Sequence, residues 1–441
     1  MAASVFDSPL YAGLFPTGET GRLFSDSASL RAMLLVEGAL AKAQGALGII
    51  PEISAAAIHR ATLEIQIDPG ALAQATGENG VSVPGMVAAF REEMNAPEHA
   101  QYLHWGATSQ DIIDTGLMLR LRQALALAET NLEKITRSLA DQADQYADLP
   151  MPARTYGQHA TPTSWGAVIA GWGTPLMDAL DALPALRKSS LLVSLSGAAG
   201  TSAALGENAA ALRAALAEGL GLQDPECSWH TDRTPLLRIA GWMAQVTATL
   251  AAFGQTLIAL TGTELGDVTL GAGGASSTMP QKQNPVAPSV LVALSHQMSG
   301  LQATLQMASA HQHQRDGAAW FAEWMVMPQI ALSCAAALQQ TQRILDGLEP
   351  DAVRMAAGLE DSLGLIHAEA LSFALAGKMP RPEAQSAAKT LCREAAQSGT
   401  PLSQLALARY PDLPADLFHP AAQLGQAPAL ARAFAARARA R

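Results

Sequence analysis

The segment Gly271–Pro285 carries the densest set of side chains that could do chemistry. Glycines at its start are followed by two adjacent hydroxyls, an amine and an amide. Glycines let a loop move, and a mobile loop that carries Ser, Lys and Asn can close over an anion and transfer a proton. A Gly/Ser linker would explain the glycines but not the ordered run Met279–Asn284. The segment therefore predicts a functional loop, and Pro285 suits the first turn of a following helix.

Three further polar segments lie between stretches that we expect to be long helices. They are His104–Gly116, Arg154–Gly166 and His311–Trp324. Polar connections that flank rigid helices are where binding and catalytic residues tend to lie. We therefore expect the functional residues in these segments and in Gly271–Pro285.

Three of the four segments resemble signature blocks of the fumarase/aspartase superfamily. The run Ser276–Pro285 is similar to Gly-Ser-Ser-x-Met-Pro-x-Lys-x-Asn-Pro, with Ala275 in place of the signature's Gly. His104–Thr115 resembles the block His-x-Gly-x-Thr-Ser-x-Asp, and Arg154–Thr163 resembles Arg-Thr-His-x-Gln-x-Ala. The blocks occur in the family's order over nearly the whole chain.

The resemblance implies an all-α fold of three helical domains with a central bundle of long helices. We place an N-terminal domain at residues 1–110, the bundle at 111–350 and a C-terminal domain at 351–441. It also implies a homotetramer, in which each active site combines the three blocks from three different subunits and binds a small polycarboxylate.

Two departures from the family pattern are informative. Tyr156 stands where the second block has its His, and Ser289, seven positions after Lys282, stands where the family has a Glu that partners this His. A lyase that expels an amine or hydroxide needs an acid to protonate the leaving group. A carboxylate, whose conjugate acid has a pKa of about 4, needs none. Intramolecular addition of a carboxylate to an activated double bond, which forms a lactone, is such a reaction.

The 3-carboxy-cis,cis-muconate cycloisomerase branch of the superfamily performs that reaction and also lacks the His. Three further segments resemble this branch, namely Leu23–Ala41, Trp229–Arg233 and Arg315–Trp324. The expected function is thus a cycloisomerase that converts 3-carboxy-cis,cis-muconate to a carboxymuconolactone in protocatechuate and β-ketoadipate breakdown. The alternatives are an adenylosuccinate- or argininosuccinate-type lyase that releases fumarate, and a non-catalytic structural protein like the lens crystallins of this fold.

The resemblance also implies roles for single residues. Ser276 would transfer the proton, and Lys282 would stabilise the charge that builds on the acceptor carboxylate. Arg315 could form a bidentate pair with a carboxylate. The expected substrate-binding residues are His104, Thr108, Ser109, Thr155, Tyr156, Gln158, Ser277, Met279, Asn284 and Arg315.

Several side chains keep two interpretations. Tyr156 could be a packing aromatic or a hydroxyl donor, and His159 could replace the family's His or be aimed elsewhere. His313 could face the site or solvent, and His230 could be structural or contact the substrate. Arg154 could bind a carboxylate or a loop carbonyl.

Composition limits the remaining possibilities. The formal charge of −11 argues against nucleic acid, because a phosphate backbone requires a basic surface. The three cysteines are far apart and read as reduced thiols of a cytoplasmic protein, and the first ten residues do not resemble a signal peptide. The sequence contains no dinucleotide fingerprint, metal-ligand cluster or phosphate loop, so we expect no cofactor and no metal.

Hydrophobic periodicity predicts the long helices. A helix is expected over Ser27–Leu47, and apolar residues spaced alternately by three and four run from Met118 to Leu139 and from Leu236 to Leu260. Two more helices are expected from Pro285 to Ala310 and from Met325 to Leu348. A last helix is expected at 429–441.

Two stretches without charged residues need an explanation. No Asp, Glu, Lys or Arg occurs between Arg238 and Glu264 or between Lys282 and Arg315. Stretches of this length can be transmembrane helices. Both contain several polar residues, however, and neither has flanking basic clusters or a Trp/Tyr belt. We therefore expect helices buried in an oligomer core, with no membrane partner.

Overall fold

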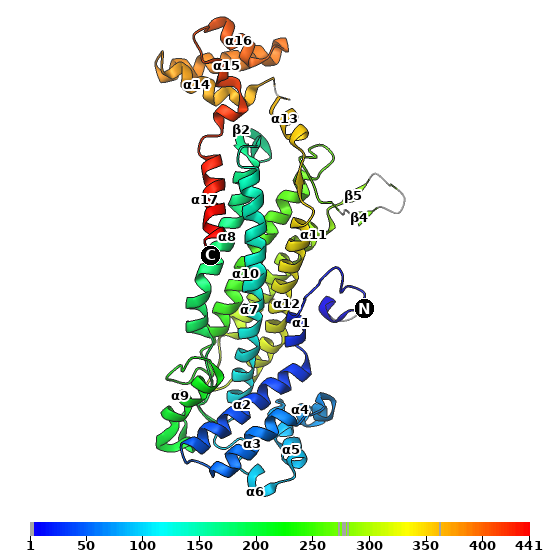
Figure 1. Ribbon diagram of the computed structural model, residues 1–441, viewed down its shortest axis with the longest axis vertical. Helices are drawn as coiled ribbons and strands as arrows, with labels where there is room; N and C mark the ends of the chain where they lie inside the picture. The colour runs from blue at the N-terminus through cyan, green and yellow to red at the C-terminus, as the bar shows by residue number, and fades with distance from the viewer. Residues whose placement is uncertain (1–3, 272–273, 276–278, 280–281, 361–362) are drawn as a thin grey trace. The chain divides into compact units, whose positions relative to one another are not determined.

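The protein is mainly helical, as Figure 1 shows for the computed structural model. The structure describes residues 4–271, 274–275, 279, 282–360 and 363–441. Within them, strands form three two-stranded antiparallel sheets: β1 (Pro150–Thr155) with β2 (Gln158–Ser164), β3 (Val268–Thr269) with β6 (Glu349–Pro350), and β4 (Gly274–Ala275) with β5 (Gln283–Asn284). The predicted all-α class is confirmed.

The chain folds as two compact units, each built from separate stretches of sequence. Unit 1 comprises Met1–Asn131, Ala179–Ala248 and Ala293–Gln339, and unit 2 comprises Leu132–Asp178, Thr249–Val292 and Gln340–Arg441. The long helices pass from one unit into the other. The expected division into three domains stays a prediction.

Unit 1 holds the shorter N-terminal helices and parts of the long helices. These are α1 (Thr20–Leu23), α2 (Asp26–Ala46), α3 (Glu52–Glu64), α4 (Ala73–Asn79), α5 (Val83–Met94), α6 (Pro97–Ala100), the start of α7 (Ser109–Gln145), the end of α8 (Trp165–Ser190), α9 (Ala209–Leu220), the start of α10 (Thr234–Leu260), and most of α11 (Val286–Ala308) and α12 (Gly317–Leu345). Short 3₁₀ turns occur at Val5–Asp7, Pro69–Leu72 and Ala203–Asn208.

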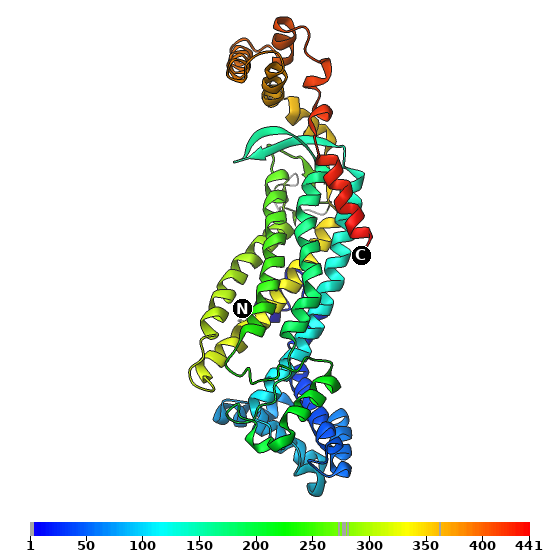
Figure 2. The ribbon, with the colours of Figure 1, turned by 90° about the vertical axis from the view of Figure 1, so that its left-hand side faces the viewer.

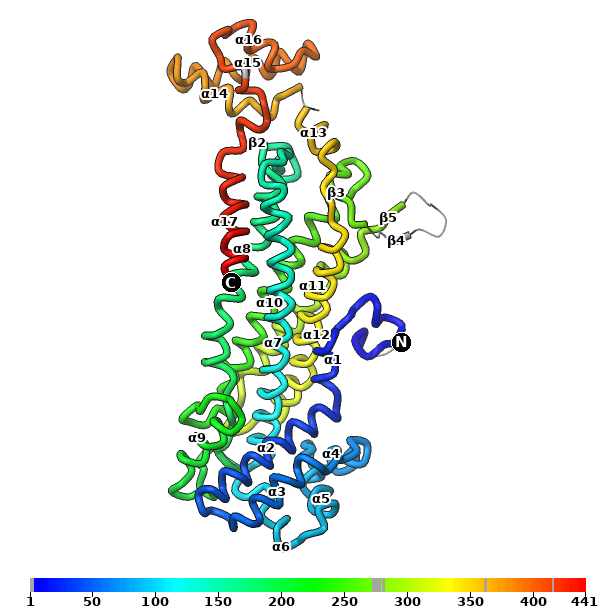
Figure 3. Tube along the Cα trace, in the orientation of Figure 1, coloured from blue at the N-terminus to red at the C-terminus, as the bar shows by residue number. Residues whose placement is uncertain are grey.

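Helix α2 is the main support of the first block, and its start follows from local chemistry. The Ser25 hydroxyl accepts a hydrogen bond from the Ala28 amide at 3.2 Å and so caps the first turn. The apolar face of α2, including Leu34 and Leu40, is buried, and α2 lies beside α3 (Figure 3). The predicted helix at Ser27–Leu47 is therefore confirmed within a residue at each end.

Unit 2 holds the remaining helices and the strands. It contains the second part of α7, the first part of α8, the end of α10, the start of α11 and the end of α12. It also contains α13 (Ala352–Glu360), α14 (Ala368–Ala376), α15 (Arg381–Ser398), α16 (Leu402–Arg409) and α17 (Ala427–Arg439). Its 3₁₀ turns are Leu365–His367, Ala415–Phe418 and Pro420–Gln423.

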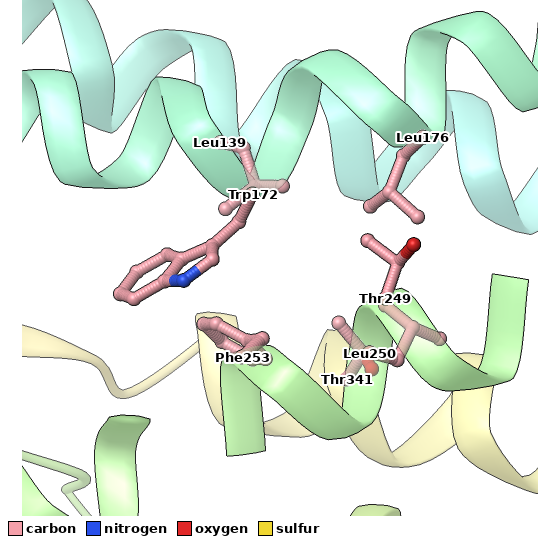
Figure 4. Close-up of a pocket in the computed structure, with 7 residues that line it drawn as sticks. All are labelled: Leu139, Trp172, Leu176, Thr249, Leu250, Phe253 and Thr341. Atoms are coloured by element: carbon pink, nitrogen blue, oxygen red, sulfur yellow. The ribbon is translucent and has the colours of Figure 1, made fainter. Parts of the chain in front are cut away.

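The helices of unit 2 meet around a small hollow, shown in Figure 4. Leu139 of α7, Leu176 of α8 and Phe253 of α10 point into it, and Thr341 of α12 closes one side. None of the residues that line this hollow carries a charge. It is therefore a packing feature of the bundle and offers no group for proton transfer.

The C-terminal helix α17 is fastened to the bundle by charge as well as by packing. Arg439 pairs with Asp144 of α7 at 2.8 Å, and Arg437 pairs with Asp178 of α8 at 2.7 Å. Figures 1 and 2 show α17 beside α8. Because these pairs are exposed, each contributes roughly 0–1 kcal/mol. The predicted helix over 429–441 is confirmed, although it begins and ends two residues earlier.

The other predicted helices are also found, and the structure adds two elements that were not predicted. The helix expected from Met325 starts earlier, at Gly317, because the Asp316 carboxylate accepts hydrogen bonds from the Ala318 and Ala319 amides and caps it. The polar segment Arg154–Gly166 is mostly a β-hairpin, which Figure 2 shows clearly. The long helix α8 that follows it was not predicted.

Two helices, α10 and α12, are long and apolar enough to cross a membrane by length and composition. In the most apolar 18-residue window of each, 50% and 67% of the residues are buried inside the protein. Buried core helices meet the same criteria, so this finding alone does not indicate a membrane span.

Candidate active site

The Asp111 carboxylate, in the first turn of α7, is the centre of a buried polar network in unit 1. It accepts five hydrogen bonds of 2.8–3.1 Å, from the amides of Thr108, Ser196 and Gly197, the hydroxyl of Ser194 and Nε2 of His230. Its side chain is fully buried, so these donors replace the water that an exposed carboxylate would bind. The carboxylate thereby joins the start of α7 to two loops.

A second buried cluster lies one helical turn further along α7. Arg233 is held between Asp114, at 2.8 and 3.1 Å, and Glu323, at 2.7 Å. Burial alone would lower the pKa of Arg233, but the two carboxylates outweigh it and raise the pKa above its usual value. The Trp320 indole donates to Asp114 at 3.3 Å, and His311 Nε2 lies 3.4 Å from Glu323. The segments Trp229–Arg233 and Arg315–Trp324 therefore meet here.

Arg315 lies at the N-terminus of α7, beside Thr108. Its Nε donates to the Gln110 side chain at 2.7 Å, and its Nη2 donates to the Thr108 hydroxyl at 3.4 Å and the Ala198 carbonyl at 3.2 Å. A helix N-terminus carries free amides and a partial positive charge, which favour anions. Thr108, the half-buried Ser109 and Arg315 thus form a place suited to a carboxylate.

His104 is bound to a buried carboxylate of α2. Its Nδ1 lies 2.7 Å from Oε1 of Glu37. Burial lowers the pKa of His104, but the hydrogen bond and charge of Glu37, with a smaller contribution from Asp111, raise it above the usual value overall. The backbone of His104 has a φ of 65°, which is uncommon for a residue other than glycine.

The second block forms the tip of the β1–β2 hairpin in unit 2. Tyr156 and Gly157, at φ 53° and 74°, are the two residues between the paired Thr155 and Gln158. Such two-residue turns require positive φ at both central positions. The side chain of Tyr156 is fully exposed, so Tyr156 is not a packing aromatic within its own chain. Thr155, Gln158 and His159 are exposed as well.

Arg154, which lies close to the turn of this hairpin, pairs with a carboxylate of the same chain. Its Nη2 lies 2.8 Å from the buried Asp267, which directly precedes β3. A weaker contact of 3.5 Å joins Nη1 to the Pro152 carbonyl. The ion pair ties the hairpin to the strand that leads into Gly271–Pro285, and a role of Arg154 toward a substrate carboxylate stays a prediction.

The third block is described only in part. Ser276 and Ser277 lie outside the described residues. Lys282 is exposed, and its amide donates to the Met279 carbonyl at 3.0 Å. Met279 is 43% exposed, and Asn284 lies on β5 opposite Gly274.

The structure thus gathers His104, Thr108, Ser109 and Arg315 in unit 1, and places the second and third blocks in unit 2. Their roles toward a substrate stay predictions. The sequence did not point to Glu37, Asp114 or Glu323, although all lie in segments that resemble the family. His313 is exposed with a φ of 53°, and His230 is structural, through Asp111.

Metal ligands were not expected, and none of the described residues forms a group of three or more His, Cys, Asp or Glu side chains that could hold a metal ion. His311 is directed to Glu323, and that carboxylate is already occupied by Arg233.

Replacing Asp111→Asn tests the central network. An amide keeps one acceptor but turns an N–H group toward donors, which leaves several of them unpaired in a buried place. We expect a loss of about 3–5 kcal/mol in the free energy of unfolding, measured by urea denaturation. The matched change Asp178→Asn removes an exposed ion pair and should cost about 0–1 kcal/mol. Equal losses in the two variants would contradict the central role of Asp111.

The chain is similar to known proteins over nearly its whole length. A family model described as "Lyase" matches residues 16–300. The 3-carboxy-cis,cis-muconate cycloisomerase of Pseudomonas aeruginosa is 42% identical over 88% of this chain and 86% of that protein. The nitrosuccinate lyase of Streptomyces davaonensis is 34% identical over 97% of this chain and 94% of that protein.

Solved structures give the same result. The 3-carboxy-cis,cis-muconate lactonizing enzyme from Pseudomonas putida has a TM-score of 0.91 and 36% identity, over 98% of this chain and 99% of that chain. The chain therefore belongs to the lyase family that the model describes, the fumarase/aspartase superfamily, and within it to the 3-carboxy-cis,cis-muconate cycloisomerase branch.

Proposed function

We propose that this protein is a 3-carboxy-cis,cis-muconate cycloisomerase. It adds one carboxylate of the substrate to a double bond of the same molecule and forms a carboxymuconolactone. The proposal is supported by the relatives of that name in Pseudomonas aeruginosa and Pseudomonas putida, which are 42% and 40% identical to this chain. It places the protein in bacterial breakdown of protocatechuate through β-ketoadipate, in the cytoplasm.

One observation carries the proposal beyond family resemblance. The Ser289 hydroxyl, at the position of the family's Glu, donates to the Pro285 carbonyl of its own chain at 2.8 Å. A serine hydroxyl carries no negative charge, so it cannot stabilise a catalytic imidazolium as the family's Glu does, and Tyr156 offers no imidazole. The acid that other lyases supply to a leaving nitrogen or hydroxide is therefore missing from both positions, as a carboxylate nucleophile permits.

The residues of the three blocks would divide the work. Ser276 transfers the proton at the carbon next to the acceptor carboxylate, and Lys282 with Asn284 stabilises the charge that builds there. Carboxylates of the substrate are held by hydrogen bonds from Thr108, Ser109, Gln158 and Arg315, and the site wall is completed by His104, Thr155, Tyr156, Ser277 and Met279.

The active form would be a homotetramer whose sites take the three blocks from three subunits. In unit 1, the exposed face of α11 consists of uncharged side chains spaced by three and four residues: Ala293, His296, Gly300, Ala303 and Met307. Met307 and the neighbouring helix's Met325 are each 71% exposed. An uncharged, mostly small-residue seam of this spacing fits a long helix of a second copy. The fully exposed Tyr156 is also consistent with a site that other subunits complete.

A fumarate-releasing lyase is the alternative. The nitrosuccinate lyase relative shows that other activities occur at 34% identity within this family. An adenylosuccinate- or argininosuccinate-type reaction would require acid catalysis from residues other than Tyr156 and Ser289. A structural protein without activity is the remaining possibility.

The substrate is tested directly by ultraviolet absorbance. Purified protein mixed with 3-carboxy-cis,cis-muconate should cause a rapid fall in absorbance, because cyclisation breaks the conjugated diene. Succinyl-amines and nitrosuccinate serve as comparison substrates under the same conditions. Fumarate from one of these, without muconate turnover, would favour the lyase alternative, and no turnover of any would favour a structural role.

Ser276→Ala tests the proton-transfer group. Loss of an acid–base group lowers turnover by about 10²–10⁴-fold, so we expect kcat to fall in this range while the protein stays folded. Ser289→Ala is the control: its hydroxyl only bonds its own helix, and kcat should stay within about twofold. A kcat for Ser276→Ala close to that of the parent would show that another group moves the proton.

Ala303→Glu tests the assembly. A charge placed in the exposed seam of α11 cannot be desolvated cheaply between two helices, so the tetramer should dissociate and activity should fall with it. Light scattering measures the mass, which should be four times the 45.9 kDa chain in the parent protein. Ala214→Glu, on the exposed face of α9, should leave both mass and activity unchanged. A fully tetrameric Ala303→Glu variant would exclude this face from the interface.

A further inference from the structure

Glu37 is an unusual residue for the interior of this protein. Its side chain lies on the buried face of α2 and is 0% exposed. One carboxylate oxygen, Oε1, contacts Nδ1 of His104 at 2.7 Å, and among the described residues the other oxygen, Oε2, has no hydrogen-bond partner. A buried carboxylate is costly unless a partner compensates its charge. His104 is the partner that compensates the charge of Glu37.

The geometry leaves the other side of the imidazole ring free. A carboxylate can only accept, so Nδ1–H of His104 donates to Glu37, and Nε2 is directed away from it. In the described part of the chain no hydrogen bond engages Nε2, and the His104 side chain is 21% exposed. The backbone of His104 has a φ of 65°, in the left-handed region that is uncommon for residues other than glycine.

His104 also belongs to the polar cluster already described. It precedes Thr108 by one short turn segment, and the Asp111 carboxylate is near enough to favour its cationic form. The charged groups that act on the ring are Glu37 from α2, Asp111 from α7 and Arg91 from α5; only Arg91 opposes the positive charge.

We propose that Glu37 is a positioning residue of the active site, which orients His104 and keeps it as a cation whose Nε2–H donates to a carboxylate of the substrate. This inference rests on the proposed function. Glu37 and His104 do not replace the family's missing His–Glu pair as an acid for a leaving group. They supply a fixed positive charge instead, and no bond is formed or broken by either side chain.

Such a charge would assist the reaction selectively. As the nucleophilic carboxylate adds to the double bond, negative charge moves onto the acceptor carboxylate. An imidazolium that is already aimed at this carboxylate is worth more in the transition state than in the bound substrate. Removing the support of Glu37 should therefore lower kcat more than it raises KM.

Glu37→Gln is the decisive variant. The amide keeps the size and a hydrogen bond, but it removes the charge that raises the pKa of His104. The cation is then lost at lower pH, so the alkaline fall of kcat/KM should move to lower pH. At pH values above this fall, kcat/KM of Glu37→Gln should be lower than that of the parent protein by about tenfold to a hundredfold, which corresponds to the loss of a charged hydrogen bond. At pH values below the pKa of His104 in both proteins, the difference in kcat/KM between them should shrink.

Four further variants complete the test. Glu37→Asp keeps the charge and should restore the position of the alkaline fall. His104→Gln should remove the fall altogether, and adding Glu37→Gln to it should have little further effect on kcat/KM. Glu64→Gln, on the exposed surface of α3, should match the parent protein at every pH. A uniform reduction of kcat/KM for Glu37→Gln at all pH values, with an unmoved fall, would reduce Glu37 to a structural residue and overturn the proposal.

A measurement without substrate separates this inference from the proposed function. Nuclear magnetic resonance of ¹⁵N-labelled histidine follows the titration of His104 in the free protein, and its midpoint should fall in Glu37→Gln. An unchanged midpoint overturns the coupling, whatever the substrate is. Failure of the proposed function would instead appear as a parent protein that leaves 3-carboxy-cis,cis-muconate unchanged.

Discussion

The first block depends on one buried charge, the carboxylate of Asp111. Its five hydrogen bonds fix the start of α7, the loop around Ser194–Gly197 and the ring of His230 in one arrangement. Each donor lost from a buried carboxylate costs free energy, so these three segments stabilise one another through Asp111. Arg315 reaches Thr108 because α7 begins where Asp111 holds it. The buried Asp111 side chain thus fixes the positions of Thr108 and the N-terminus of α7.

A division of labour follows for the reaction. Groups that carry a fixed charge or dipole stabilise an enolate-like state without transferring a proton, whereas an acid for a leaving group must do so. This chain keeps the fixed groups, Arg315 and the N-terminus of α7, and lacks the His–Glu pair. The hydroxyl of Ser289 donates a hydrogen bond to the Pro285 carbonyl of its own chain. A carboxylate nucleophile needs the first kind of group and not the second, which is why the loss of one pair is compatible with an otherwise intact site.

Much of the fold could be predicted because it is local. Ser25 caps α2, and the alternating apolar positions of α7 and α10 mark their buried faces. Helix α8 was missed although Ser164 accepts from the Ala167 amide at its start, because its glycines lower helix propensity and are explained only by packing: Gly166 lies against α7 and Gly173 against Phe434. Glu37 was missed for a similar reason. A glutamate in an amphipathic helix suggests solvent, and only its distant partner His104 explains its burial.

The acidic chain and the anionic substrate are reconciled by the same networks. With 39 Asp and Glu against 28 Lys and Arg, the distant field of the protein repels a polycarboxylate. Near the first block, however, the carboxylates are already occupied: Asp111 by five donors, and Asp114 and Glu323 by Arg233. Their oxygens are engaged by these donors and so do not bind Arg315, although Asp111, Asp114 and Glu323 together carry more negative charge than Arg233 offsets. Arg315 donates to uncharged groups and keeps its positive charge beside the N-terminus of α7, so local pairing as well as net charge sets the potential at this place.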